Sequence, residues 1–274
     1  MPQFGANVPG LPKLKGLVRN LVVFDSVLFF VVAIFQRAAP AAASSLLPHL
    51  LLQPIAAAHG EIWQLVTYSF FHSGVLEILF AMLSLWFCGS LLEGAYGNRF
   101  VTEVFFTSVI GGAAVASALS YTRVLSLSPN AFGAGAWAGI FGLLIAIGTR
   151  MGDTEFLFFF LIPMKARYMV ALYLLIAVAF FIRNEDAFGA LLQLSGALCG
   201  YLYVRYAPRR GLGFAFSEQV FGARNAYYRY KRRRAAKKFE VYMGKQGRNV
   251  KFDKEGRYID PDKGKDPNDK RWMN

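Results

Sequence analysis

Apolar residues gather in six long runs that are separated by shorter mixed or polar connections. A helix that crosses a hydrocarbon core of about 30 Å needs roughly 20 mostly apolar residues. Six runs approach that length, and we interpret each as a transmembrane helix. They cover residues 20–36, 75–92, 101–120, 132–149, 168–183 and 187–205. The pattern predicts an all-α fold, a polytopic membrane helical bundle with six transmembrane helices.

Two other stretches do not fit the pattern of spans and short connections. Residues 156–162 (FLFFFLI) are apolar but too short to cross and end at Pro163, so we expect an interfacial or buried stretch that leads into the fifth span. Residues 38–74 mix Pro, Ala, Leu and aromatic residues. Because backbone at membrane depth must be hydrogen-bonded internally, we expect short interfacial helices here, with Trp63 and Tyr68 at headgroup level.

Composition supports a membrane protein. The 274 residues are 55% hydrophobic and 17% charged, whereas soluble chains average about 25% charged residues. The 26 Phe and 13 Tyr exclude a disordered chain, and two cysteines exclude a disulfide framework.

The charge is concentrated at one end of the chain. Residues 204–274 hold 20 of the 30 Lys and Arg but only 8 of the 17 Asp and Glu. The chain therefore divides into an N-terminal segment (1–19), a membrane domain (20–206) and a basic tail (207–274).

Flanking cations predict the orientation. Six spans put both termini on one side, together with most of the loop cations: Lys13, Lys15, Arg19, Arg99, Arg150, Lys165 and Arg167. The opposite side carries Arg37, Arg123 and Arg183. The positive-inside bias places both termini in the cytoplasm, for a multi-pass protein of a plasma or inner membrane.

Several motifs occur in order along these spans. They are the segment 63–100 beginning WQLVTYSFFHSG, with Gly89, Glu93 and Gly97; GAWAGIFGLL at 135–144, with Gly135, Gly139 and Gly142; and QLSGALCG at 193–200, with Gly196 and Gly200. Small residues at such spacing allow helices to approach closely. With these motifs, residues 60–205 resemble the rhomboid superfamily of six-helix intramembrane serine proteases.

The resemblance implies where a rhomboid protease would carry its catalytic groups. The serine nucleophile position falls on Trp137 and the histidine base position on Gln193. The two oxyanion-stabilising positions fall on Glu77 and Ala81, and the family's Trp-Arg pair is Trp63-Gln64. An attacking oxygen and a proton acceptor are both missing, and an ionised Glu77 would repel an oxyanion. We therefore predict a pseudoprotease.

Three functions remain open. The first is a cavity formed by Glu77, Trp137 and Gln193 that binds transmembrane segments of client proteins without cleaving them. The second is an intramembrane serine endopeptidase with a relocated nucleophile, and the third is an assembly protein that acts through its tail. For Glu77, the plainer interpretation is a neutral carboxyl that is hydrogen-bonded to a neighbour. We interpret Asp25 and Glu103 as lying near their helix ends.

No cofactor or metal is expected. The three histidines (His49, His59 and His72) all fall in the first loop, without cysteine partners or a recognisable ligand spacing.

The tail predicts a helix beginning at Ser217, followed by a cluster of cations. The cluster comprises Lys231, Arg232, Arg233, Arg234, Lys237 and Lys238. Because the tail is tethered to the bilayer, we expect these side chains to contact anionic lipid headgroups rather than nucleic acid.

Overall fold

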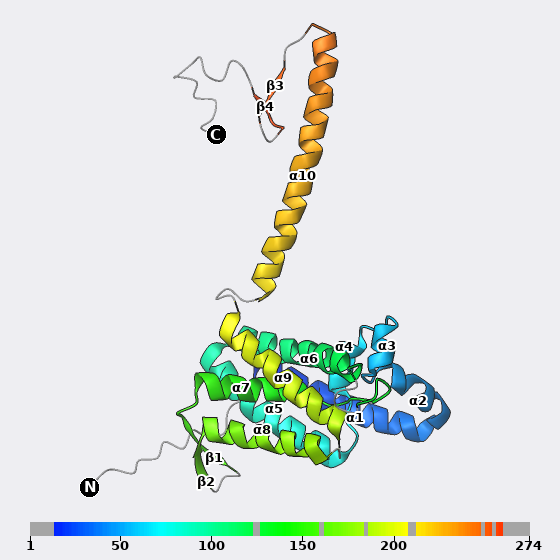
Figure 1. The fold of residues 1–274 in the computed structure, drawn as a ribbon, viewed down its shortest axis with the longest axis vertical. Coiled ribbons are helices and arrows are strands. Elements are labelled where there is room, and N and C mark those ends of the chain that lie inside the picture. Colours follow the sequence, from blue (N-terminus) through cyan, green and yellow to red (C-terminus); the bar gives the residue numbers. More distant parts are fainter. Residues whose placement is uncertain are drawn as a thin grey trace, which may run out of the picture. The chain divides into compact units, whose positions relative to one another are not determined.

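A computed structural model describes residues 14–122, 127–158, 162–183, 186–207, 212–247, 250–253 and 256–259. The chain forms two compact units, which meet in sequence between Gly211 and Leu212. Figure 1 shows the elements of each unit.

The first unit is the polytopic helical bundle that the sequence predicts. Among the described residues, five helices are long and apolar enough to span a membrane: α1 (Gly16–Ala38), α5 (Val75–Tyr96), α6 (Asn98–Ser120), α8 (Ala166–Arg183) and α9 (Ala187–Tyr206). A further apolar helix, α7 (Trp137–Arg150), is shorter and lies almost wholly buried among α5, α6, α8 and α9. The first helix begins at Gly16, inside the segment that we expected to precede it.

The helix in the fourth run is shorter than predicted. It was expected over 132–149, but α7 begins at Trp137 and its 14 residues are about 21 Å long. The chain arrives through an irregular segment in which Gly135 has φ +96°, a conformation that interrupts a helix. Backbone pairing replaces the missing turns: Leu52 and Gly133 exchange two N–H···O bonds of 3.0 and 2.8 Å. Hydropathy could not reveal this pairing, because the irregular residues are as apolar as a helix.

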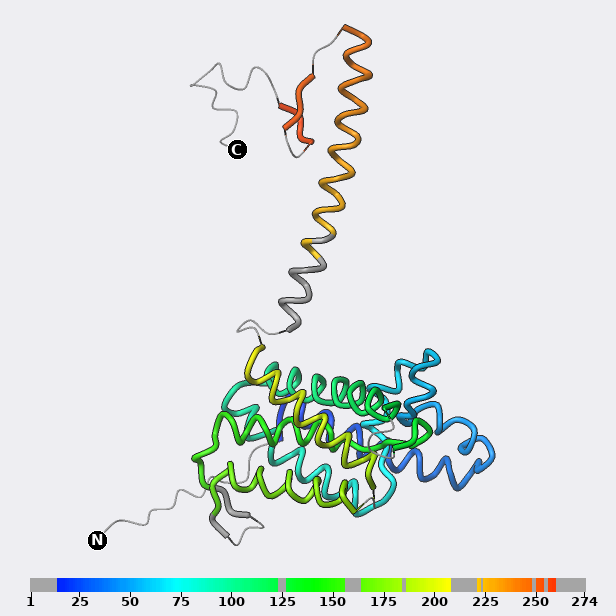
Figure 2. Tube along the Cα trace, viewed as in Figure 1, coloured from blue at the N-terminus to red at the C-terminus, as the bar shows by residue number. Residues whose placement is uncertain are grey.

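The connection between α1 and α5 contains the short helices that the sequence predicts. They are α2 (Pro40–Leu46), η1 (Leu47–His49), α3 (Pro54–Ala58), α4 (Gln64–Thr67) and η2 (Tyr68–Phe70). Figure 2 shows this blue-to-cyan connection at one end of the bundle. Trp63 is half exposed. The prediction for Tyr68 was wrong: its side chain is buried, and its hydroxyl donates to the carbonyl of Val109 on α6 at 3.0 Å.

The apolar stretch after α7 forms an antiparallel hairpin, β1 (Glu155–Phe158) and β2 (Ile162–Lys165). It leads into α8 as expected, but its strand form was not predicted. The run of Phe and Leu suits a pleated strand, and the alternation that would mark a strand is absent. Residues 159–161 lie outside the described part of the chain.

Glycines bring α6, α7 and α9 into backbone contact. A Cβ built on Gly196 would clash with the backbone of Ala138, and one on Gly200 would lie 2.6 Å from the Cα of Gly142. A Cβ on Gly112 would lie 2.9 Å from the Cα of Gly196. Close approach of this kind is how membrane helices gain packing energy without a hydrophobic driving force.

Polar contacts tie helix ends together on the side of the bundle where the tail leaves. The Leu17 amide donates to the Asn98 side chain at 3.2 Å, and the Tyr96 hydroxyl donates to the Arg150 carbonyl at 3.4 Å. The Arg150 guanidinium donates to the Val204 carbonyl at 3.1 Å. The start of α1 and the end of α9 are therefore at the same end of the bundle.

The second unit contains α10 (Leu212–Lys245) and a small antiparallel hairpin, β3 (Lys251–Phe252) and β4 (Tyr258–Ile259). The helix begins five residues before the predicted start at Ser217. The cationic side chains from Lys231 to Lys238 are exposed.

Candidate functional site

A cavity of about 370 Å³ opens at the end of the bundle where α9 begins. It lies between the first turns of α5, α7 and α9 and the irregular segment before α7. Its lining includes Glu77, Trp137 and Gln193, which the sequence analysis placed together, and also Tyr68, Ser73 and Asp186. Ala81 is fully buried one turn further along α5 and is not among the lining residues.

Glu77 lies in the first turn of α5 and is held by Ser73. One carboxylate oxygen, Oε2, accepts the Ser73 backbone N–H at 2.8 Å and the Ser73 hydroxyl at 2.5 Å. A glutamate three positions into a helix that bonds back to the preceding residues is a capping arrangement. The hydrogen-bonded neighbour of the plainer interpretation is therefore present, and the same carboxyl also lines the cavity.

The other carboxylate oxygen of Glu77 faces the start of α7. A Cβ on Gly135 would lie 2.7 Å from Oε1, and 3.3 Å from Cδ1 of Trp137. Gly135 is itself fixed by its backbone N–H, which donates to the Tyr68 carbonyl at 3.0 Å. A carboxylate at a helix N-terminus is favoured by the helix dipole, so Glu77 fills a position that attracts negative charge.

The start of α9 supplies the opposite wall. Asp186 caps this helix, accepting the backbone N–H of Gly189 at 3.0 Å, and Gln193 follows two turns along. Ser73 and Asp186 were not predicted as residues of this site. Their signals were the Ser four residues before Glu77 and an Asp directly before an apolar run, both typical of helix starts.

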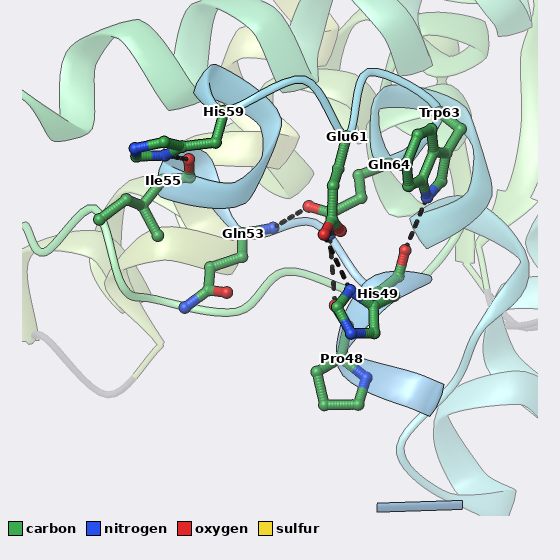
Figure 3. Close-up of polar contacts among 8 residues, drawn as sticks. All are labelled: Pro48, His49, Gln53, Ile55, His59, Glu61, Trp63 and Gln64. Carbon is green, nitrogen blue, oxygen red and sulfur yellow. Dashed lines mark hydrogen bonds and ion pairs between the residues drawn. The ribbon is translucent and has the colours of Figure 1, made fainter. Parts of the chain in front are cut away.

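The connection that leads to Tyr68 is held by a buried amide, shown in Figure 3. Gln64 is fully buried, and its Oε1 accepts the Gln53 backbone N–H at 2.9 Å. Its Nε2 donates to Glu61 at 2.6 Å and to the Pro48 carbonyl at 3.3 Å. A side chain with both donors and an acceptor satisfied fixes the connection that carries Tyr68.

The three histidines do not converge on a common site. His49 pairs with Glu61 at 2.8 Å, whereas His59 contacts the Ile55 carbonyl at 2.7 Å (Figure 3). His72 directly precedes Ser73, and both of its ring nitrogens are buried. Burial lowers the pKa of His72 below its ordinary value, and this effect is opposed by the Glu77 carboxylate and the Phe70 backbone. Among the described residues, no group of three metal-ligating side chains is found.

The other acidic residues of the spans lie outside the cavity. Glu103, near the start of α6, pairs with Arg99 at 2.9 Å and accepts the Tyr203 hydroxyl at 2.6 Å. Asp25 was expected near a helix end but lies well inside α1, on the face that packs against α5. Among the described residues, neither of its carboxylate oxygens has a hydrogen-bond partner.

The cavity lacks a serine–histidine pair at the positions that the rhomboid resemblance implies. Trp137 carries no attacking oxygen, and the Gln193 carboxamide does not accept a proton near neutral pH. The Ser73 hydroxyl does line the cavity, but it donates to a carboxylate, which is ordinarily a weak base at that pH. The arrangement can hydrogen-bond a polar group or enclose an apolar side chain.

Comparison with known proteins agrees with the membrane fold. Residues 18–215 match the family described as eukaryotic integral membrane protein (DUF1751). The chain belongs to this family. It is also 30% identical over 202 residues to rhomboid-like protein 19 of Arabidopsis thaliana, a match that covers 72% of this chain. The chain spans about three fifths of that relative's length, since the match covers 61% of it.

The similarity confirms the rhomboid-like relationship inferred from the motifs. The family match begins at the third residue of α1 and includes every element that lines the cavity. It ends at residue 215, near the start of α10, so the cationic part of the tail lies beyond it. The chain is a multi-pass integral membrane protein of rhomboid-like architecture.

Proposed function

We propose that this protein binds transmembrane segments of client proteins in the cavity between α5, α7 and α9, and does not cleave them. The observation that carries the proposal is the cavity itself. Its walls bring together Glu77, Trp137 and Gln193, at the positions where the family resemblance implies an oxyanion site, a nucleophile and a base.

The size and chemistry of the cavity support a binding role. A volume of about 370 Å³ is at the lower end of the range for ligand pockets and accommodates a few side chains. Phe132 and Leu192 supply apolar contacts, and Gln193 offers both a donor and an acceptor. Polar groups at membrane depth gain from a partner that satisfies them, so a client segment with a polar residue at this level suits the site.

Cleavage is the second candidate, because Ser73 places a hydroxyl in the cavity. A fluorophosphonate reacts with serine nucleophiles that a base has activated. We expect the purified protein to remain unlabelled, as judged by intact mass. A covalent adduct that is absent in Ser73→Ala would contradict the binding role and indicate a serine protease with a relocated nucleophile.

We also propose that both termini are cytoplasmic. Arg150, Lys165 and Arg167 lie at the end of α7, the end of β2 and the start of α8, and Arg150 contacts the end of α9. This distribution is in keeping with the positive-inside bias. The cavity then opens toward the non-cytoplasmic side, where the extramembrane parts of clients approach it.

Site-specific photocrosslinking tests client binding. A benzoylphenylalanine at Gln193 should capture membrane proteins through their transmembrane peptides, as located by mass spectrometry. The matched position on the same helix is Leu198, which is half exposed away from the cavity. Adducts from position 193 should fall at least tenfold when Ala134→Trp fills the cavity.

The control for that substitution is Ala114→Trp, at an exposed position of α6 outside the cavity. It should leave the adducts from position 193 unchanged. Equal capture from positions 193 and 198, or adducts that persist in Ala134→Trp, would show that the cavity does not select transmembrane segments.

A further inference from the structure

The hairpin β3–β4 covers one face of α10. Ala236, Phe239 and Met243 face the hairpin, and the ring of Phe239 meets that of Phe252 edge-on with centroids 6.1 Å apart. Gly256 lies against the helix backbone, since a Cβ there would be 2.9 Å from Arg232 C. This face is therefore occupied by the chain itself.

A second side of α10 combines cations with tyrosines. Residues three or four positions apart share one side of a helix. Tyr227, Lys231, Arg234, Lys238 and Tyr242 follow that spacing. The centre of this stripe lies about a third of a turn around the helix from the centre of the hairpin-covered positions. All five side chains are exposed, with Tyr227 at 62% and Tyr242 at 58%. We call these five residues the cationic face.

Among the six cations singled out in the sequence, only three belong to this face. Lys231, Arg234 and Lys238 lie on it, whereas Arg232 lines the groove between helix and hairpin. By the same periodicity Arg233 and Lys237 lie on a third side of the helix, about a third of a turn from each of the other two. The six cations are close together in the sequence, but three of them lie on the cationic face and the other three lie elsewhere on the helix.

We propose that the cationic face binds the anionic headgroups of a lipid bilayer. Its three cations provide the charge complementarity, at about 1 kcal/mol for each Lys or Arg near an anionic surface. Its two tyrosines present an apolar ring and a polar hydroxyl, the combination that favours the headgroup level. Among the side chains of α10 that the structure describes, no continuous apolar stripe accompanies them, so the face is suited to the surface rather than to the hydrocarbon.

Chain connectivity favours lipid over nucleic acid as the occupant. Five residues, 207–211, connect α9 to α10, and an extended chain of that length reaches at most about 18 Å. The tail is therefore permanently tethered to the membrane surface. The tether gives the lipid headgroups a high effective concentration near α10. A nucleic acid in solution would have to bind more tightly, or be more concentrated, to compete with them.

The test uses the full-length protein in nanodiscs of phosphatidylcholine alone or with added phosphatidylserine. A fluorescent coumarin amino acid replaces Tyr227, and lipids with nitroxide headgroups quench it when the helix lies on the surface. We expect strong quenching only with phosphatidylserine, and loss of that quenching as salt is raised. Quenching that is equal in neutral and anionic discs would overturn the proposal.

Two triple variants remove the same charge from different faces. Lys231→Ala, Arg234→Ala and Lys238→Ala together should shift the ratio of bound to free helix by about 100-fold, near fivefold per cation. Arg232→Ala, Arg233→Ala and Lys237→Ala together should shift it far less. Equal losses would mean that charge alone, without a defined face, governs binding. Release of the helix by a short RNA at micromolar concentration would instead identify a nucleic-acid surface.

Discussion

At the scale of single residues, the protonation of His72 is expected to make the stability of the protein depend on pH. Its ring nitrogens are buried next to the residue that holds Glu77, and burial lowers its pKa below 6.5. Between the lowered pKa and the ordinary one, the unfolded chain binds a proton that the folded protein does not. Stability is therefore complete above about pH 7 and is lost as the pH falls through that window.

We expect the melting temperature in detergent to fall on acidification from pH 7 to pH 5, and His72→Gln to flatten that dependence. The matched variant is His59→Gln, which changes an exposed ring and should retain the slope of the wild type. A wild-type slope that persists in His72→Gln would assign the titration to another group.

The residues of the cavity were predictable to different degrees. Trp137 and Gln193 were placed correctly beside Glu77 because glycine motifs on the same helices fix their register. Ser73 and Asp186 were missed because helix-capping residues are common and carry no chemical signature on their own. Tyr68 was assigned to the interface because a tyrosine in an irregular apolar stretch is typical there, and its bond to Val109 depends on tertiary structure.

At the scale of elements, α9 and α7 depend on the absence of side chains at their crossing. A methyl group on Gly196 would meet the backbone of Ala138, which cannot move as a side chain does. Gly196→Ala should therefore destabilise the bundle by about 1–3 kcal/mol, measured as a shift of the unfolding midpoint in mixed micelles.

The matched substitution is Gly94→Ala in α5, where a Cβ would meet nothing within 4 Å. Because alanine is the better helix former, Gly94→Ala should be neutral or slightly stabilising. Equal destabilisation by both substitutions would argue against a close crossing of α7 and α9.

The elements that follow from hydropathy were predicted correctly. Those whose form depends on backbone pairing were missed. The five long spans follow from their apolar length. The start of α7 does not, because Gly135 and the pairing of Gly133 with Leu52 end the helix without any change of polarity. The hairpin β1–β2 was missed for a similar reason, since its apolar run has no alternation.

At the scale of the whole molecule, the two units are expected to act separately. Every residue that lines the cavity comes from the first unit. Deletion of residues 212–274 should therefore leave the melting temperature and the crosslinking from position 193 within error of the wild type. Loss of crosslinking with an unchanged melting temperature would favour the assembly role of the tail.

The pairing between Leu52 and Gly133 has a consequence for how the cavity behaves. Two backbone hydrogen bonds join Leu52 and Gly133 at the rim, in place of the regular series of hydrogen bonds that a helix would provide. We therefore expect this rim to exchange its amide hydrogens faster than the glycine-packed centre of the bundle.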